Sequence, residues 1–161
     1  QNIIKKNLER QDKCNGIKNK RAKERILKSL REKLKNKVDD LQWKSINYLT
    51  TNYKNIIIGK WSTKSIISKE DSILQKMNKR IIQSISYYKL LERLKFKSII
   101  HKNNLIIREE WYTSKTCTSC GNKKEDLGGN KIYSCVKCNL ITDRDYNGCR
   151  NIFLTTIKSI N

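Results

Sequence analysis

Apolar residues recur every three or four positions along residues 17–49, and this spacing predicts one long amphipathic helix. The stripe expected to be buried is Leu27, Leu30, Leu34, Val38, Leu41, Ser45 and Tyr48. A short apolar block follows at residues 53–61, where three consecutive isoleucines stand between Asn55 and Gly59. Because β-branched residues in a short block favour a strand buried on both faces, this block predicts a strand of the parallel type.

A second helix and a second strand are expected further along the chain. Ser68 with Asp71 three residues later resembles a capping box at the start of a helix. Helical spacing then continues through Leu74, Met77, Ile81, Ile85, Tyr88, Leu91 and Leu94, a stripe that predicts core packing. After a polar turn at residues 102–104, residues 105–111 predict a strand ending in two glutamates, and His101 is expected to be an ordinary loop residue.

The order of these elements predicts an α/β fold with a mixed sheet, long basic helices and an inserted cysteine module before a closing helix. We expect a polar basic lead-in at residues 1–16 and an α/β segment at residues 17–111. The cysteine module is expected at residues 112–142, and the closing motif and helix at residues 143–161.

Four of the six cysteines form two Cys-x-x-Cys knuckles separated by 14 residues. Their ligands would be Cys117, Cys120, Cys135 and Cys138. A hairpin of that length can bring both pairs to one tetrahedral ion, so the pattern predicts a closed, structural zinc ribbon.

The alternative for these cysteines is a pair of disulfides. The sequence shows no signal-peptide pattern, which disfavours an oxidising compartment and hence disulfides. Cys14 and Cys149 have no partner in the pattern and are expected to be free thiols.

The formal net charge of +21 excludes an ordinary neutral metabolic enzyme and points to a polyanionic partner, most simply nucleic acid. Residues 1–116 hold 29 basic and 11 acidic side chains, so the basic footprint is N-terminal. The other interpretation of such a run is a solvated helix face. No apolar run is long enough for a membrane span, so we expect an intracellular protein that neither meets a membrane nor acts on a small-molecule substrate. The expected nucleic-acid contacts are Lys18, Lys20, Arg21, Lys23, Arg25, Lys28, Arg31 and Lys35.

Carboxylates flank the cysteine module on both sides. Glu109 and Glu110 end the second predicted strand, and Asp143 and Asp145 follow the second knuckle. Because the two ends of a ribbon must be adjacent, these acids should approach one another and could hold Mg²⁺ for phosphodiester chemistry. The competing interpretation is helix capping, since acids in a first turn favour the N-terminal end of a helix.

Several segments resemble the C-terminal half of the transposon-encoded TnpB/OrfB nucleases, their eukaryotic relatives called Fanzor, and the small type V CRISPR effectors. The resemblance lies in YTSKTCTSCG at residues 112–121, the second Cys-x-x-Cys and DRDYNGCRN at residues 143–151. Upstream, LQWK at residues 41–44 and IIIGKWSTK at residues 56–64 are similar to segments around the family's second RuvC motif. The resemblance implies a RuvC-like, RNase H-type fold that cleaves DNA with two metal ions under the direction of a guide RNA, and nuclear location if the host is eukaryotic.

In that family's terms, residues 17–111 and 143–161 would form part of the RuvC-like domain, and residues 112–142 a ribbon that binds target nucleic acid. Asp145 matches the third RuvC acid, and Asp143 a less essential acid. Where bacterial relatives place the second acid, this chain has Gly59 and Lys60, so the resemblance assigns that role to Glu110. Glu109 is the weaker candidate because neighbouring strand residues face opposite ways.

The first RuvC acid has no match among these residues, which implies a catalytically incomplete C-terminal piece that needs Mg²⁺ only within the complete enzyme. Two other functions remain open: a stand-alone zinc ribbon that binds nucleic acid, and a protein-interaction ribbon. The presence of both Glu110 and Asp145 beside the ribbon favours the nuclease.

Overall fold

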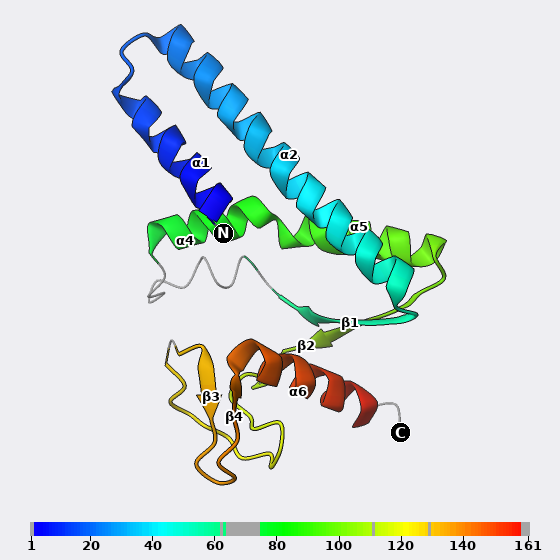
Figure 1. Ribbon diagram of the computed structural model, residues 1–161. Coiled ribbons are helices and arrows are strands. Elements are labelled where there is room, and N and C mark those ends of the chain that lie inside the picture. The colour runs from blue at the N-terminus through cyan, green and yellow to red at the C-terminus, as the bar shows by residue number, and fades with distance from the viewer. Residues whose placement is uncertain (1, 62, 64–74, 111, 129, 159–161) are drawn as a thin grey trace. The chain divides into compact units, whose positions relative to one another are not determined.

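The computed structural model describes residues 2–61, 63, 75–110, 112–128 and 130–158. The chain divides into two compact units, one of Gln1–Lys54 with Ser62–Asn103 and the other of Asn55–Trp61 with Asn104–Asn161. The first is helical, and the second holds the strands and the last helix (Figure 1). The two Cys-x-x-Cys knuckles and Cys149 belong to the second unit, whereas Cys14 belongs to the first. None of the described helices is long and apolar enough to cross a membrane.

The first unit begins with a helix that the sequence pattern did not predict. Instead of a lead-in, α1 (Asn2–Lys13) and a short 3₁₀ turn, η1 (Cys14–Gly16), precede the long helix. Ile4 and Leu8, one turn apart, are buried against Leu34, Val38 and Ile81. Two apolar residues on one face are enough to dock α1, because the long helix and α4 supply the rest of this core.

The long helix α2 (Lys20–Asn52) confirms the predicted element, but its buried stripe differs from the expected one. Asn19 caps it, its side chain accepting a hydrogen bond from the Ala22 backbone N–H at 3.1 Å. The buried positions are four residues apart: Leu34, Val38, Gln42, Ile46 and Thr50. Leu41 and Tyr48, expected inside, are 58% and 59% exposed. The apolar pattern predicted the wrong face for the second half of α2, because two of its buried residues, Gln42 and Thr50, are polar.

The second predicted helix is two helices, α4 (Lys76–Ile85) and α5 (Tyr87–Ile100), separated at Ser86. Ser86 has a left-handed backbone with φ of 49°, so the helical path turns there. The buried Gln42 side chain donates from Nε2 to the Ile85 carbonyl at 2.6 Å, satisfying a carbonyl that the break leaves free. After the break Tyr87 and Leu94 are buried and Tyr88 is exposed. The expected capping box at Ser68 and Asp71, with Leu74, lies outside the described residues.

An ion-pair network fastens α5 to α2. Asp39 accepts from Lys89 at 2.9 Å and from Arg93 at 2.8 Å. These bonds, that of Arg93 first, hold the pKa of Asp39 below its ordinary value. The network therefore stabilises the fold above the ordinary carboxyl pKa and is lost as pH falls through the lowered one. Arg93 also lies over the Trp43 ring, 5.0 Å from its centroid.

The second unit contains two small sheets and one helix. Strands β1 (Asn55–Lys60) and β2 (Asn104–Glu109) pair in parallel, with Gly59 opposite Arg108, which confirms the parallel strand predicted from the isoleucine block. Strands β3 (Ile132–Ser134) and β4 (Ile141–Asp143) pair antiparallel. Helix α6 (Arg144–Lys158) packs against both pairs, which confirms a mixed α/β architecture with the cysteine module inserted before the last helix.

Candidate functional site: a four-cysteine ribbon beside a carboxylate pocket

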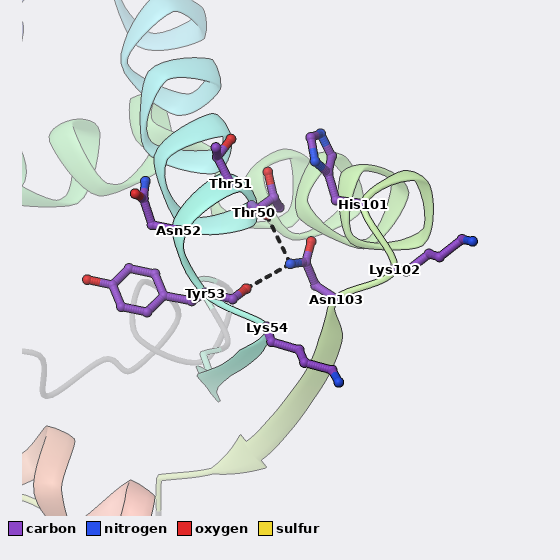
Figure 2. Close-up of a pocket in the computed structure, with 8 residues that line it drawn as sticks. All are labelled: Thr50, Thr51, Asn52, Tyr53, Lys54, His101, Lys102 and Asn103. Atoms are coloured by element: carbon purple, nitrogen blue, oxygen red, sulfur yellow. Dashed lines mark hydrogen bonds between the residues drawn. The ribbon is translucent and has the colours of Figure 1, made fainter.

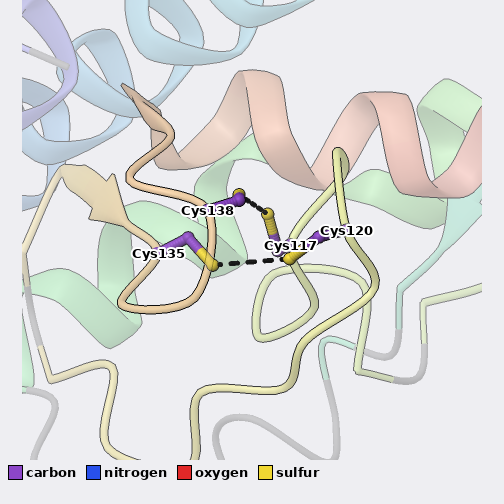
Figure 3. Close-up of side chains that lie close together, drawn as sticks. All are labelled: Cys117, Cys120, Cys135 and Cys138. Atoms are coloured by element: carbon purple, nitrogen blue, oxygen red, sulfur yellow. Dashed lines mark hydrogen bonds between the residues drawn. The ribbon is translucent and has the colours of Figure 1, made fainter.

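The four predicted cysteines converge on one point (Figure 3). Their Sγ atoms all lie within 4.8 Å of one another, and the pairs Cys117–Cys138 and Cys120–Cys135 are each 3.6 Å apart. A tetrahedral ion with Zn–S bonds of about 2.3 Å would place its sulfur atoms about 3.8 Å apart. The donor set and its spacing therefore fit one tetrahedral thiolate-bound metal ion, with all six cysteines in the free form.

Both knuckles have the same backbone geometry. The carbonyl of Cys117 accepts from the Gly121 N–H at 2.9 Å, and that of Cys135 accepts from the Asn139 N–H at 3.0 Å. Gly121 and Asn139, each directly after the second cysteine of its knuckle, have left-handed φ angles of 73° and 57°. Glycine and asparagine are the residues that adopt this conformation most readily, so each knuckle ends where the sequence permits the turn.

The ribbon's apolar core is very small. Leu127 and Tyr133 are buried with Cys117 and Cys135, and Leu140 packs against them. Tyr133 is fully buried, and its hydroxyl donates to the Lys115 carbonyl at 3.3 Å. So few apolar side chains cannot hold a hairpin of this length by burial alone, and a bound ion would supply the remaining stability.

The pKa values of Cys135 and Cys120 are shifted in opposite directions. Hydrogen bonds from the backbone N–H groups of Cys138 and Lys137 lower the pKa of Cys135 to about 6. At Cys120 the Asn122 backbone acts in the same direction, but desolvation and the neighbouring thiols outweigh it and raise the pKa to about 11. A divalent cation at the centre would favour the thiolate form of all four.

Two asparagines on α6 hold the ribbon's first knuckle. The fully buried Asn147 accepts from the Thr118 N–H at 3.0 Å and donates to the Thr116 carbonyl at 2.7 Å, so its amide grips the backbone on both sides of Cys117. One turn later, Asn151 donates to the carbonyls of Thr113 and Thr116. Sequence analysis missed this role, although two asparagines four residues apart on one helix face are a usable signal.

Glu110 occupies space that a side chain at residue 59 would need. A Cβ at Gly59 would lie 2.6 Å from the Glu110 Cγ and closer still to its carboxylate. Both residues line a pocket of about 480 Å³ with Cys149, Ile152 and Phe153 of α6. Glu110 follows the carboxyl end of β2 and Gly59 lies near that of β1, the edge at which α/β sheets place their ligands.

The two adjacent glutamates have different environments. Glu109 accepts from the Lys60 ammonium at 2.7 Å and is thereby neutralised at the surface. Among the residues that the structure describes, Glu110 forms no ion pair with a cationic side chain, and partial desolvation raises its pKa. A raised pKa means that the fold disfavours the ionised carboxylate, a penalty that appears as pH rises through the folded-state pKa and that a bound cation would relieve.

The two aspartates also separate into different roles. The Asp143 Oδ1 accepts from the backbone N–H groups of Asp145 and Tyr146, at 2.8 Å and 3.0 Å, so Asp143 caps the N-terminus of α6. Asp145 is exposed in the first helical turn. It stands four residues before Cys149, so it shares the face of α6 that lines the Glu110 pocket.

A second pocket, of about 410 Å³, lies in the helical unit (Figure 2). Asn103 donates from one side-chain nitrogen to the carbonyls of Thr50, at 3.0 Å, and Tyr53, at 2.7 Å, and so closes the end of α2. His101 and Lys102 also line it, and His101 lies in the turn directly after α5, as expected of a loop residue, where it is the C-cap of that helix. The residues of this pocket directly precede β1 and β2 in the chain. The hydrogen bonds of Asn103 stabilise the end of α2.

The basic residues expected to contact nucleic acid lie on and just before α2. Seven of them are within the helix and Lys18 precedes it; all are exposed except Lys23, which is half-buried. Within the described part of the chain, none of them forms an ion pair with a carboxylate. The structure therefore leaves these charges available to a polyanion.

Four converging cysteines, bonded to a helix beside a strand-end carboxylate, define a class of small α/β modules with a candidate metal site. Three comparisons with known proteins narrow that class. Residues 87–152 match the family model described as Cas12f1-like, TNB domain. The chain is 32% identical over 166 residues to TnpB-like protein L79 of Acanthamoeba polyphaga mimivirus, an alignment that covers 98% of this chain and 32% of that protein.

It is also 31% identical over 90 residues to the CRISPR-associated endodeoxyribonuclease Cas12f1 of Sulfoacidibacillus thermotolerans, which covers 54% of this chain and 21% of that protein. Among solved structures, a Cas12f1–sgRNA–target DNA complex matches with a TM-score of 0.56 and 23% identity, covering 81% of this chain and 38% of that one. The chain belongs to the TnpB/Cas12f-type family, and it spans about a third of the length of the viral TnpB-like relatives.

Proposed function

We propose that this chain is the C-terminal part of a transposon-associated, RNA-guided DNA endonuclease, with a RuvC-like arrangement of acids and a zinc ribbon that binds target nucleic acid. The observation that carries the proposal is the Glu110 carboxylate, which fills the space left by Gly59 at the carboxyl end of the parallel pair. Bacterial relatives have their second acid where this chain has Gly59 and Lys60, and a side chain at residue 59 would point into the space that Glu110 fills.

In this proposal Glu110 and Asp145 bind divalent metal, Asp143 orients the first turn of α6, and Glu109 has no catalytic role. Glu110 fills the space beside Gly59, and Asp145 is exposed in the first turn of α6. Asp143 instead caps α6, and Glu109 is paired with Lys60. The metal would supply charge neutralisation at the scissile phosphate. Cys117, Cys120, Cys135 and Cys138 would hold structural zinc, for which their donor set and spacing are suited.

The partners proposed are DNA and a guide RNA. The relative whose structure matches was solved with sgRNA and target DNA, and the exposed cations of α2 supply the charge for similar partners here. A stand-alone ribbon that binds nucleic acid or protein is the second candidate. One observation favours it: Asp143 is accounted for by capping alone.

The chain itself tests the proposal. It should bind single-stranded and duplex DNA with little base preference, and the affinity should fall by about a thousandfold or more between 50 and 200 mM salt if six or more phosphates are contacted. With Mg²⁺ it should not cut, because Glu110 and Asp145 are only two of the acids a two-metal site requires. An affinity unchanged by salt would contradict the nucleic-acid assignment, and metal-dependent cutting would show that the acids are wrongly assigned.

A further inference from the structure

A basic groove lies between α1 and α2, outside the pocket that holds Glu110. It has a volume of about 240 Å³, and its apolar floor is the buried Leu34, beside the 63% exposed Ile3. Four cations line it: Lys6, Arg10, Lys33 and Lys37. All four cationic side chains are exposed, while Leu34 is buried. Figure 1 shows α1 running alongside the first half of α2, so the groove follows the seam between two helices of the same unit.

The cations form two facing rows. Lys6 and Arg10 are four residues apart on α1, and Lys33 and Lys37 are four residues apart on α2. With a helical rise of 1.5 Å per residue, the members of each pair lie about 6 Å apart along the helix axis. That separation is similar to the distance between neighbouring phosphates along a nucleic-acid strand, so each row can meet consecutive phosphates.

Contacts between α1 and α2 hold the two walls of the groove in place. The Asn7 side chain, between the two cations of α1, donates to the Leu30 carbonyl of α2 at 3.1 Å and accepts from the Gln11 side chain at 2.8 Å. Below it, Ile4 and Leu8 are buried against Leu34 and Val38. The spacing of the two rows is therefore set by a packed seam, which lowers the cost of ordering the walls on binding.

The four charges are uncompensated within the described residues. None of them forms an ion pair there, and the nearby acids on α1 have other partners, Glu9 with Lys5 and Asp12 with Arg80. Like charges four residues apart on a helix repel one another. A bound polyanion would relieve that repulsion in both rows at once.

We propose that this groove is a subsite for the sugar–phosphate backbone of a nucleic-acid strand, with the two rows on the phosphates and the apolar floor against the sugars. The inference rests on the proposed nucleic-acid-binding function and assigns part of it to one place. It also separates the α2 cations by face: at 100° per residue, Lys28 and Lys35 lie on the face opposite Lys33 and Lys37. The groove residues should therefore contribute more than those two lysines do.

Two charge-matched variants of the 161-residue chain test the subsite. Lys33→Gln/Lys37→Gln removes one wall of the groove, and Lys28→Gln/Lys35→Gln removes two charges from the opposite face of the same helix. The probe is a fluorescein-labelled single-stranded DNA, titrated at several salt concentrations. We expect the groove variant to weaken binding by about tenfold or more and to lower the salt slope by about 1.4. The control variant on the opposite face also removes two expected phosphate contacts, and we expect it to weaken binding by a clearly smaller factor. Lys6→Gln/Arg10→Gln should reproduce the groove result from the other wall.

Equal losses in the groove and control variants, with wild-type binding still salt-dependent, would overturn the subsite and leave the proposed function intact. Absence of salt-dependent binding by the wild-type chain would overturn both. Poly-glutamate that binds the wild-type chain more tightly than the oligonucleotide, and loses this advantage in the groove variant, would replace the strand with an acidic protein partner. Circular dichroism and thermal melting check that every variant is folded.

Discussion

Replacing any one of Cys117, Cys120, Cys135 and Cys138 with serine should abolish stoichiometric zinc binding and unfold the ribbon. A metal held by four thiolates contributes on the order of 10 kcal/mol to the folding of such sites, far more than the few buried side chains around Tyr133 can replace. Metal analysis of the purified, reduced chain measures the loss directly, and we expect one equivalent of zinc in the wild type. Cys149→Ser is the matched control, because Cys149 is exposed on α6 and is not part of the four-cysteine cluster.

The loss of zinc should also reach α6. Asn147 and Asn151 bond the backbone on either side of Cys117, so release of the knuckle leaves two buried amides without partners. Such groups cost about 1–3 kcal/mol each when left unsatisfied. Chelation should therefore increase amide exchange in the first turns of α6 as well as in the knuckles. Wild-type protein that lacks zinc and carries disulfides at these positions would contradict the metal assignment.

Gly59→Ala should leave the fold intact and yet disable catalysis in a reconstructed nuclease, meaning this chain joined to the upstream part of a TnpB-like relative and supplied with guide RNA. The new Cβ would collide with the Glu110 side chain, whose far end can swing away at small cost to stability. A displacement of about 1 Å in a catalytic group can cost on the order of a hundredfold in rate. We therefore expect cleavage to fall by about that factor while the melting temperature changes little.

The matched control for this prediction is Gly16→Ala, since a Cβ at Gly16 meets nothing within 4 Å. It should leave cleavage unchanged. If Gly59→Ala cleaves like the wild type, the space beside Gly59 does not position the catalytic carboxylate. A large loss of stability in Gly59→Ala would instead mean that backbone, rather than Glu110, resists the added atom.

The elements with a strong local signal could be predicted from the sequence. The isoleucine block gave the parallel strand β1, and the spacing of the two knuckles identified all four cysteines that converge. Both depend on chemistry contained in a few neighbouring residues. The long helix α2 was predicted for the same reason, with its start displaced to the Asn19 cap.

The features that depend on tertiary partners could not be predicted. Gln42 and Thr50 occupy buried positions of α2 because the Ile85 carbonyl and the helix's own Ile46 carbonyl accept their hydrogen bonds, and hydrophobic periodicity does not register polar residues. Helix α1 was missed because Ile4 and Leu8 gain their burial from α2 and α4. The contact between Gly59 and Glu110 depends on the register of β1 against β2, which no local pattern specifies.

The most direct test of the account is guided DNA cleavage by the reconstructed nuclease with Glu110→Gln, compared with Glu109→Gln. The substitutions are adjacent and chemically identical, but Glu110 lies in the Gly59 pocket and Glu109 is paired with Lys60. We expect Glu110→Gln to abolish cleavage while zinc content and salt-dependent binding stay at wild-type levels, and we expect the Glu109→Gln enzyme still to cut. Cleavage that survives Glu110→Gln, or is lost only with Glu109→Gln, would contradict the assignment of Glu110 as the metal-binding acid.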